Sequence, residues 1–131
     1  MSVRELRILD SVTSPTGRTL VGLGELVDAL VDRIPPLAHS MLTVSRGAWG
    51  QGEWACSVED ELTTKATTAV EAAALTDALD AGEVFYNVEF SCDSPPVRFG
   101  VVDSAWLFVA GDDDLIEAIS AQFTDVYIVT L

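Results

Sequence analysis

The stretch that most constrains the fold is residues 84–110, where apolar and polar residues alternate with a period of two. A first predicted strand has two faces, one with Tyr86, Val88, Phe90 and Cys92, the other with Phe85, Asn87, Glu89 and Ser91. SCDSPP then turns the chain, and Val97, Phe99 and Val101 alternate again before a tight turn at Asp103 and Ser104. AWLFVA, at 105–110, is apolar on both faces. That pattern is typical of an interior strand, so this half predicts an antiparallel meander.

The remaining elements are predicted from the same kind of spacing. Further strands are expected at residues 4–12, 41–46, 53–59 and 126–131, and helices at 23–34, 66–81 and 115–123. Pro35 and Pro36 end the first helix, and Gly82 closes the second. TSPTG, after the first strand, has turn chemistry.

These elements predict an α+β fold in a single domain spanning 1–131. The order strand, helix, strand at the C-terminal end favours a right-handed crossover between parallel neighbours. We therefore expect a mixed, mostly antiparallel sheet of about six strands with about three helices packed on it.

Charge is distributed unevenly along the chain. Residues 1–65 hold 9 acidic and 6 basic residues, whereas 66–131 hold 12 acidic residues and one base, Arg98. The halves carry −3 and −11, which together make the net charge of −14. Nucleic acids and anionic membranes attract clustered Lys and Arg, so neither is an expected direct partner. A cationic protein surface is the natural complement, and the alternative is that the charge only maintains solubility.

The N-terminal residues and the cysteines indicate the compartment. MSVRELRILD lacks both an apolar signal core and a membrane span of ~20 residues, so a cytoplasmic protein is expected. Cys56 and Cys92 lie in apolar strand patterns, and the prediction is two reduced thiols that are at least partly shielded.

The sequence offers few residues that could carry catalysis or hold a metal or cofactor. The only histidine, His39, is adjacent to Ser40, and neighbours on a strand point to opposite faces, so the pair is not a catalytic dyad. His39, Cys56 and Cys92 have no paired metal-ligand spacing. Neither glycine-rich phosphate-binding pattern occurs. The sequence therefore predicts no catalytic residue, no cofactor and no metal.

Three consecutive aspartates, Asp112, Asp113 and Asp114, precede the third predicted helix. A carboxylate there accepts hydrogen bonds from free backbone N–H groups and interacts favourably with the helix dipole. A calcium loop needs ligands spread over about twelve residues with a central Gly, which LIEAISAQF does not supply. The triplet is predicted to cap the helix, while its carboxylates remain available to a partner.

The segment RGAWGQGEW, at 46–54, is the best recognition candidate. Its glycines free the backbone between two predicted strands, and Trp49 stands among them. Trp is over-represented among interface hot spots, although this ring could instead fold back over the core. Glu59, Asp60 and Glu61 are interpreted as a solvated strand end. The candidate partner-binding residues are Trp49, Glu53, Asp103, Asp112, Asp113 and Asp114.

The segment VRFGVVDSAWLFVAGDDDLIEAISAQF, at 97–123, resembles the immunity proteins of bacterial polymorphic-toxin and contact-dependent systems in its strand, turn, strand and acid-capped helix. The resemblance covers only this part of the chain. It implies an inhibitor that occludes the active site of a cognate toxin, often a nuclease, by charge and shape complementarity. It assigns no role to an individual residue.

Two alternatives stay open. One is a noncatalytic structural or assembly adaptor, associated with a phage or a secretion system. The other is a small-ligand-binding protein or an enzyme, which predicts a deep pocket with convergent polar groups. Oligomeric state is not predicted by the sequence.

Overall fold

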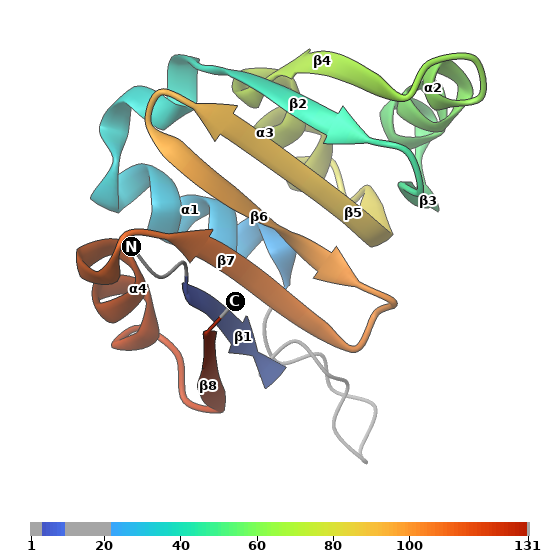
Figure 1. Cartoon of the computed structure of the whole chain (residues 1–131). Coiled ribbons are helices and arrows are strands. Elements are labelled where there is room, and N and C mark those ends of the chain that lie inside the picture. Colours follow the sequence, from blue (N-terminus) through green and yellow to red (C-terminus); the bar gives the residue numbers. More distant parts are fainter. Residues whose placement is uncertain (1–3, 10–21, 131) are drawn as a thin grey trace.

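The structure is a computed structural model that describes residues 4–9 and 22–130. Within them, eight strands form one sheet in the order β4-β2-β5-β6-β7-β1-β8, with β3 paired to β5 (Figure 1). The strands are β1 (Arg4–Ile8), β2 (Met41–Ser45), β3 (Trp49–Gln51), β4 (Thr67–Glu71), β5 (Val84–Asp93), β6 (Pro96–Val102), β7 (Trp106–Gly111) and β8 (Val126–Thr130).

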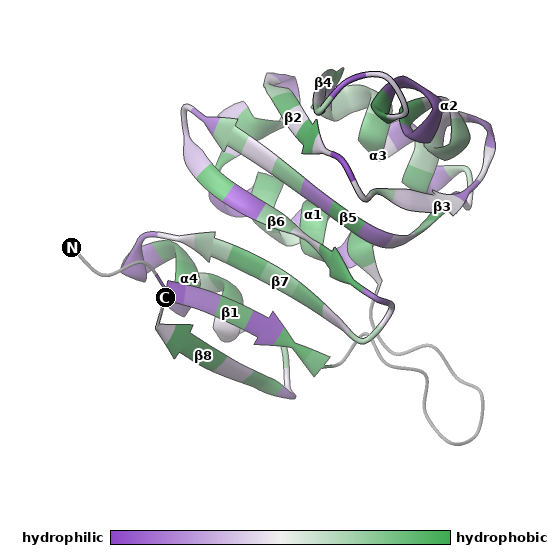
Figure 2. Cartoon of the chain, turned by 45° about the vertical axis from the view of Figure 1, so that its right-hand side comes forward, coloured by the Kyte–Doolittle hydropathy of each residue, from purple (hydrophilic) through white to green (hydrophobic). Residues whose placement is uncertain are grey.

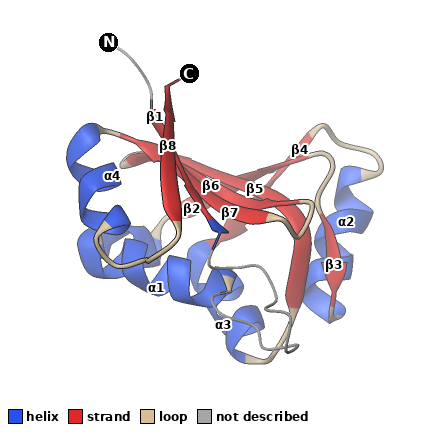
Figure 3. Ribbon diagram, turned by 90° about the horizontal axis from the view of Figure 1, so that it is seen from below, coloured by secondary structure: helices blue, strands red, loops and turns tan. Residues whose placement is uncertain are grey.

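Four α-helices accompany this sheet in the described residues: α1 (Leu23–Arg33), α2 (Glu53–Leu62), α3 (Ala72–Asp80) and α4 (Asp113–Ser120). A 3-10 helix, η2 (Pro35–His39), follows α1. Helices α1, α3 and α4 lie on the same face of the sheet (Figure 3). Helix α2 lies at one end, packed against β3 and β4.

The core lies between the sheet and these helices. Val97, Phe99 and Val101 of β6 are buried, as their alternation predicts. Phe90 stacks on Phe99 across β5 and β6 with ring centroids 5.4 Å apart. The apolar stripe of α1 packs onto this layer, burying Leu26 and Leu30 completely. Burying a Leu or Phe side chain contributes about 1.5–3 kcal/mol, so this shared layer stabilises the fold.

The antiparallel meander predicted for residues 84–110 is confirmed, and so are helices at the positions of α1 and α4. Asp103 and Ser104 both have positive φ, 48° and 57°, and the Ala105 N–H donates to the Val102 carbonyl at 2.8 Å. This is a tight turn between two hydrogen-bonded strands. Strand β7 lies between β6 and β1, and its Leu107–Ala110 segment is buried, as expected of an interior strand.

The predicted mixed sheet is wrong, because every strand pair in the described residues is antiparallel. Strands β7 and β8 do run in the same direction, as the crossover through α4 requires. However, β1 lies between them and pairs antiparallel with both. Strand β1 therefore separates β7 from β8, which were predicted to be adjacent parallel strands.

The predicted strand at 53–59 is also wrong, since these residues begin helix α2. Gly52 follows β3 and has a φ of 126°, a backbone conformation that residues with a side chain rarely adopt. The buried positions of α2 are Ala55, Val58 and Leu62, whose spacing of three and four is helical. The apparent alternation of Trp54, Cys56 and Val58 is therefore misleading.

The predicted helix at 66–81 is two elements. Thr67–Glu71 is strand β4, which pairs antiparallel with β2, and the helix begins only at Ala72. The β-branched residues Thr67, Thr68 and Val70 favour the extended conformation despite the surrounding alanines. Gly82 follows the helix with φ at 90°, as expected of a helix-closing glycine.

Both cysteines are free thiols, but the predicted shielding is wrong for one of them. Cys56 is exposed on α2, because the helical turn carries it away from the sheet, and Cys92 is partly buried. The assignment of strand faces fails similarly near the start of β5, where Phe85 is 4% exposed although it was placed opposite Val88 and Phe90. A register shift in the pairing of β3 with β5, between Trp49 and Gly50, accompanies this change.

Parts of two predicted elements fall outside the described residues. These are the end of the first strand with the TSPTG turn, within 10–21, and residue 131 of the last strand. Among the residues that the structure does describe, no helix combines the length and apolar character needed to cross a membrane.

Candidate functional site

The six candidate residues lie at two ends of the sheet. Strand β7 begins just after the turn that contains Asp103 and ends just before Asp112. Trp49 and Asp103 lie at the first end, and Asp112, Asp113 and Asp114 lie at the other. Glu53 is exposed in the first turn of α2. The candidates therefore do not form one continuous patch.

Trp49 lies in strand β3 and not in a free loop. Its side chain is held against Tyr86, with ring centroids 4.7 Å apart, yet the residue keeps 49% of its surface exposed. The ring therefore packs partly on the protein and keeps a free surface, and its role in partner binding stays a prediction.

Asn87 holds the two turns at this end of the sheet together. Its Nδ2 donates to the Gly47 carbonyl at 3.1 Å, and its Oδ1 accepts from the Asp103 N–H at 3.0 Å. Ser104 also donates through its backbone N–H to the Tyr86 carbonyl at 2.7 Å. Trp49, Tyr86 and Asp103 are therefore fixed relative to one another. The only sequence signal for Asn87 was a polar residue within a predicted strand.

The aspartate triplet caps α4, as predicted. The Asp112 side chain accepts a hydrogen bond from the Leu115 N–H at 2.8 Å. Asp113 forms an exposed ion pair with Arg4 at 3.4 Å. In the described part of the chain, no group of three His, Cys, Asp or Glu side chains is arranged to hold a metal ion.

Replacing Asp112 by Ala is expected to lower the free energy of unfolding by about 1 kcal/mol, because the Leu115 N–H loses its acceptor. Urea denaturation measures this change. Asp114→Ala is the matched control, since Asp114 is exposed and makes no side-chain hydrogen bond within the described residues. Equal losses in both variants would contradict the capping role.

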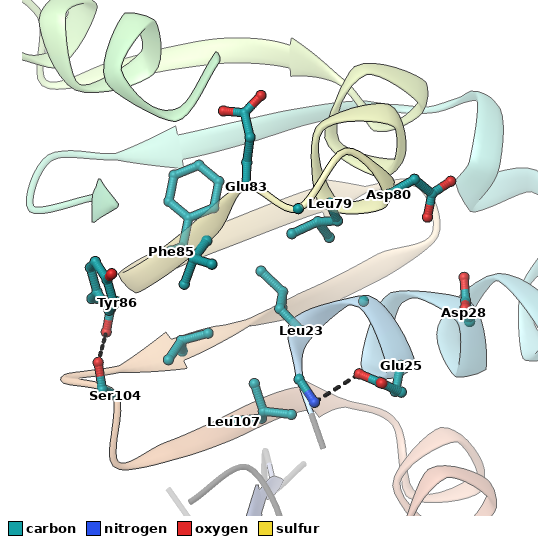
Figure 4. Close-up of a pocket in the computed structure, with 15 residues that line it drawn as sticks. Leu23, Glu25, Asp28, Leu79, Asp80, Glu83, Phe85, Tyr86, Ser104 and Leu107 are labelled. Atoms are coloured by element: carbon teal, nitrogen blue, oxygen red, sulfur yellow. Dashed lines mark hydrogen bonds between the residues drawn. The ribbon is translucent and has the colours of Figure 1, made fainter. Parts of the chain in front are cut away.

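A cleft of about 630 Å³ opens between α1, α3 and the start of β5, close to the Trp49 end of the sheet (Figure 4). Tyr86, whose ring contacts Trp49, belongs to its wall. Its apolar lining comes from five elements and consists of Leu23, Leu79, Val84, Phe85, Val101 and Leu107. The volume is in the range of small-molecule and side-chain binding pockets.

Four carboxylates line this cleft: Glu25, Asp28, Asp80 and Glu83. Glu25 accepts from the Gly22 N–H at 2.7 Å, and Glu83 accepts from the Ala55 N–H at 2.9 Å. Asp28 and Asp80 are exposed and have no side-chain partner within residues 4–9 and 22–130. No Lys, Arg or His is among the described residues that line the cleft. Its potential is therefore negative, and two of its carboxylates remain available.

Two hydroxyl-bearing side chains complete the described polar lining of this cleft. The side-chain hydroxyls in its lining come from Tyr86 and Ser104, and no described histidine or cysteine accompanies them. His39 is exposed at the end of η2, and the neighbouring Ser40 hydroxyl donates to the Pro36 carbonyl at 2.9 Å. An apolar floor with carboxylates at its rim suits a group that is both aliphatic and cationic, such as a Lys or Arg side chain.

Sequence reasoning missed this cleft. From the sequence, no binding role was assigned to Asp28 or Asp80. The two residues belong to helices that are separated in the chain by η2, β2, β3, α2 and β4. No match was found among known protein families, curated protein sequences or solved structures.

Proposed function

We propose that this protein is a noncatalytic inhibitor that binds a basic protein, as an immunity protein binds its cognate toxin. The observation that carries the proposal is the cleft that combines an apolar floor with carboxylates and contains no base among its described lining residues. Such a cleft rejects anions and receives the cationic side chains of a basic active-site surface.

Charge and the aromatic residue contribute differently to this binding. The C-terminal half, with 12 acidic residues against one base, generates a long-range field that attracts a basic partner. Tyr86 lines the cleft and Trp49 packs on Tyr86, so the two rings provide a contact surface beside the cleft that must lose water before the complex is stable. The field therefore governs association, and the cleft with its aromatic edge governs dissociation.

The resemblance of 97–123 to immunity proteins supports the same proposal, since the strands and the capped helix of that segment are present. The alternative of a small-ligand protein is favoured by the cleft volume of about 630 Å³. The carboxylates of the cleft favour a protein partner over a small ligand. Asp28 and Asp80 are exposed, and the other two carboxylates already accept backbone hydrogen bonds, so the polar groups do not converge on an enclosed ligand.

A captured partner tests the proposal. The tagged protein is used to isolate its partner from the native host, and the partner's activity is then measured against increasing amounts of this protein. We expect loss of activity at a one-to-one ratio. A partner whose activity is unchanged at saturation would support the adaptor alternative and contradict the inhibitor.

The salt dependence of the association rate is a second expected outcome. Between about 50 and 500 mM NaCl the rate should fall several-fold, because salt screens exposed charges beyond about 8 Å at physiological ionic strength. Dissociation should change little, since it depends on desolvated contacts. Surface plasmon resonance measures both rates. An association rate that does not depend on salt would contradict the proposal that charge attracts the partner.

A further inference from the structure

The outer edge of β8 is a surface that the proposed function does not use. Among residues 4–9 and 22–130, strand β8 is the last strand of the sheet and pairs only with β1 (Figure 1). Edge strands present rows of backbone N–H and C=O groups that can pair with another strand. Proteins commonly block such pairing with charges, prolines, bulges or a covering element.

The register identifies which backbone groups of β8 point outward. The Leu9 N–H donates to the Asp125 carbonyl at 2.8 Å, and this pair continues the register that joins Ile8 to Val126. Hydrogen-bonded pairs alternate along antiparallel strands, so residues 127 and 129 also point toward β1. Val126, Ile128 and Thr130 therefore direct their backbone N–H and C=O groups away from the sheet.

The side chains of this edge lack the usual protection. VYIVT contains no charge, no Pro and no Gly, and Figure 2 shows β8 as a hydrophobic strand beside the charged β1. Tyr127 and Ile128 keep 42% and 47% of their surface exposed. The opposite edge strand, β4, differs, because it ends in Glu71 and is packed by α2 and α3.

The inner side of β8 is firmly attached, so the strand is already formed when a partner arrives. Arg7 donates to the Tyr127 hydroxyl at 3.5 Å, and its guanidinium lies 5.9 Å from the centre of that ring. The hydrogen bonds to Tyr127 and to Glu5 raise the pKa of Arg7 above its ordinary value. The hydrogen bond to the Tyr127 hydroxyl and the approach of the guanidinium to the Tyr127 ring join β1 to β8.

We propose that β8 pairs antiparallel with β8 of a second copy of this chain, about a two-fold axis at Ile128. In that register Val126 meets Thr130 of the other copy, Tyr127 meets its Val129, and Ile128 meets its own equivalent. Each outward N–H then lies opposite an outward C=O, and every side-chain pair is uncharged. The strand is self-complementary, as a two-fold interface requires.

Charge and size set the expected strength. Each copy carries a net charge of −14, so the copies repel at low salt, while the interface strands themselves are neutral. Five residues per copy are far fewer than the roughly 20–30 of a standard interface, so a dissociation constant on the order of 100 µM is expected. Added salt should strengthen this dimer, whereas it should weaken binding of a basic partner.

Sedimentation equilibrium between about 1 µM and 1 mM protein, at 50 and 500 mM NaCl, tests the dimer. We expect a monomer–dimer equilibrium that tightens several-fold at the higher salt. Ile128→Lys should abolish it by placing two like charges at the axis, and Ile128→Pro should abolish it by removing an outward N–H. Met41→Lys is the matched control, because Met41 is 56% exposed but lies on the interior strand β2. This control should dimerise as the unmodified chain does.

Hydrogen exchange on the unmodified chain gives a readout that does not depend on how the variants fold. Amides of Val126, Ile128 and Thr130 should exchange fast at low concentration and slow at high concentration, while those of Tyr127 and Val129 stay slow throughout. A monomer at 1 mM in high salt, or Ile128→Lys dimerising like the unmodified chain, would overturn the proposal. Either result leaves binding of a basic partner untouched, so the two proposals fail separately.

Discussion

Replacing Gly100 by Ala is expected to lower the free energy of unfolding by about 3–5 kcal/mol, which places it among the most damaging single substitutions. Gly100 lies in β6, an interior strand. A Cβ there would lie 1.9 Å from the Val88 carbonyl oxygen and 3.1 Å from the Phe108 ring. Because the nearest obstacle is backbone, no side-chain rotation relieves the clash, and two central strands must separate.

Gly24→Ala is the matched control for this result. Gly24 lies in the first turn of α1, and a Cβ there would meet nothing within 4 Å. Ala is the better helix former, so a gain of about 0.5 kcal/mol is expected. Urea denaturation of both variants gives the comparison. A loss below about 1 kcal/mol for Gly100→Ala would show that β5 and β6 are not packed as closely as described.

Trp49→Ala is expected to raise the dissociation rate of the captured partner about 30-fold, corresponding to a hot-spot loss of about 2 kcal/mol. Half of this residue's surface is free for contact, and Tyr86 fixes the ring, so little side-chain entropy is lost on binding. The association rate should be nearly unchanged, because no charge is altered.

Trp49→Phe provides the graded comparison, since it keeps an aromatic ring against Tyr86 while it reduces the outward contact area. It should give an intermediate dissociation rate. Thermal unfolding of both variants separates a local effect from loss of fold. A dissociation rate that is equal in the unmodified chain and in Trp49→Ala would exclude this residue from the interface.

An element could be predicted from the sequence where its hydrophobic pattern fitted either a strand or a helix, but not both. The alternation at Val97, Phe99 and Val101 fits a strand only, and the apolar run of β7 is too short for a helix of ordinary length. Residues 53–59 fit both, because Trp54 and Val58 satisfy both a two-residue and a four-residue repeat. Only Leu62, beyond the predicted strand, distinguishes the helix, and it does so by being buried at the next helical position.

Strand β4 was missed for a different reason. Its sequence follows Ala66 and leads directly into the alanine-rich helix, so the whole stretch has the composition of a helix. Its extended conformation depends on pairing with β2, a contact between residues such as Thr43 and Ala69 that are far apart in the chain. Local propensity does not include the stabilisation from this long-range pairing. The β-branched residues Thr67, Thr68 and Val70 were nevertheless a local indication of a strand.

The candidate site was predictable only in part. The capping role of Asp112 follows from its position before an amphipathic pattern, whereas the glycine-rich surroundings of Trp49 left its exposure open. The cleft does not follow from any segment, because the packing of α1 against α3 brings Asp28 and Asp80 to one opening. Charge composition indicated an acidic surface, and only the fold could place it.

The measurement that most directly tests the acidic cleft as the binding site compares two double variants against the captured partner. Asp28→Asn with Asp80→Asn removes the two available carboxylates of the cleft. Asp60→Asn with Asp93→Asn removes two exposed carboxylates outside its lining, so both proteins lose the same charge. Calorimetric titration should show a dissociation constant raised about tenfold or more for the first variant, at least about 1.4 kcal/mol. The second should change by less than about threefold, as expected of exposed charges. Equal losses in the two variants would contradict the account, because binding would then follow net charge and not the cleft.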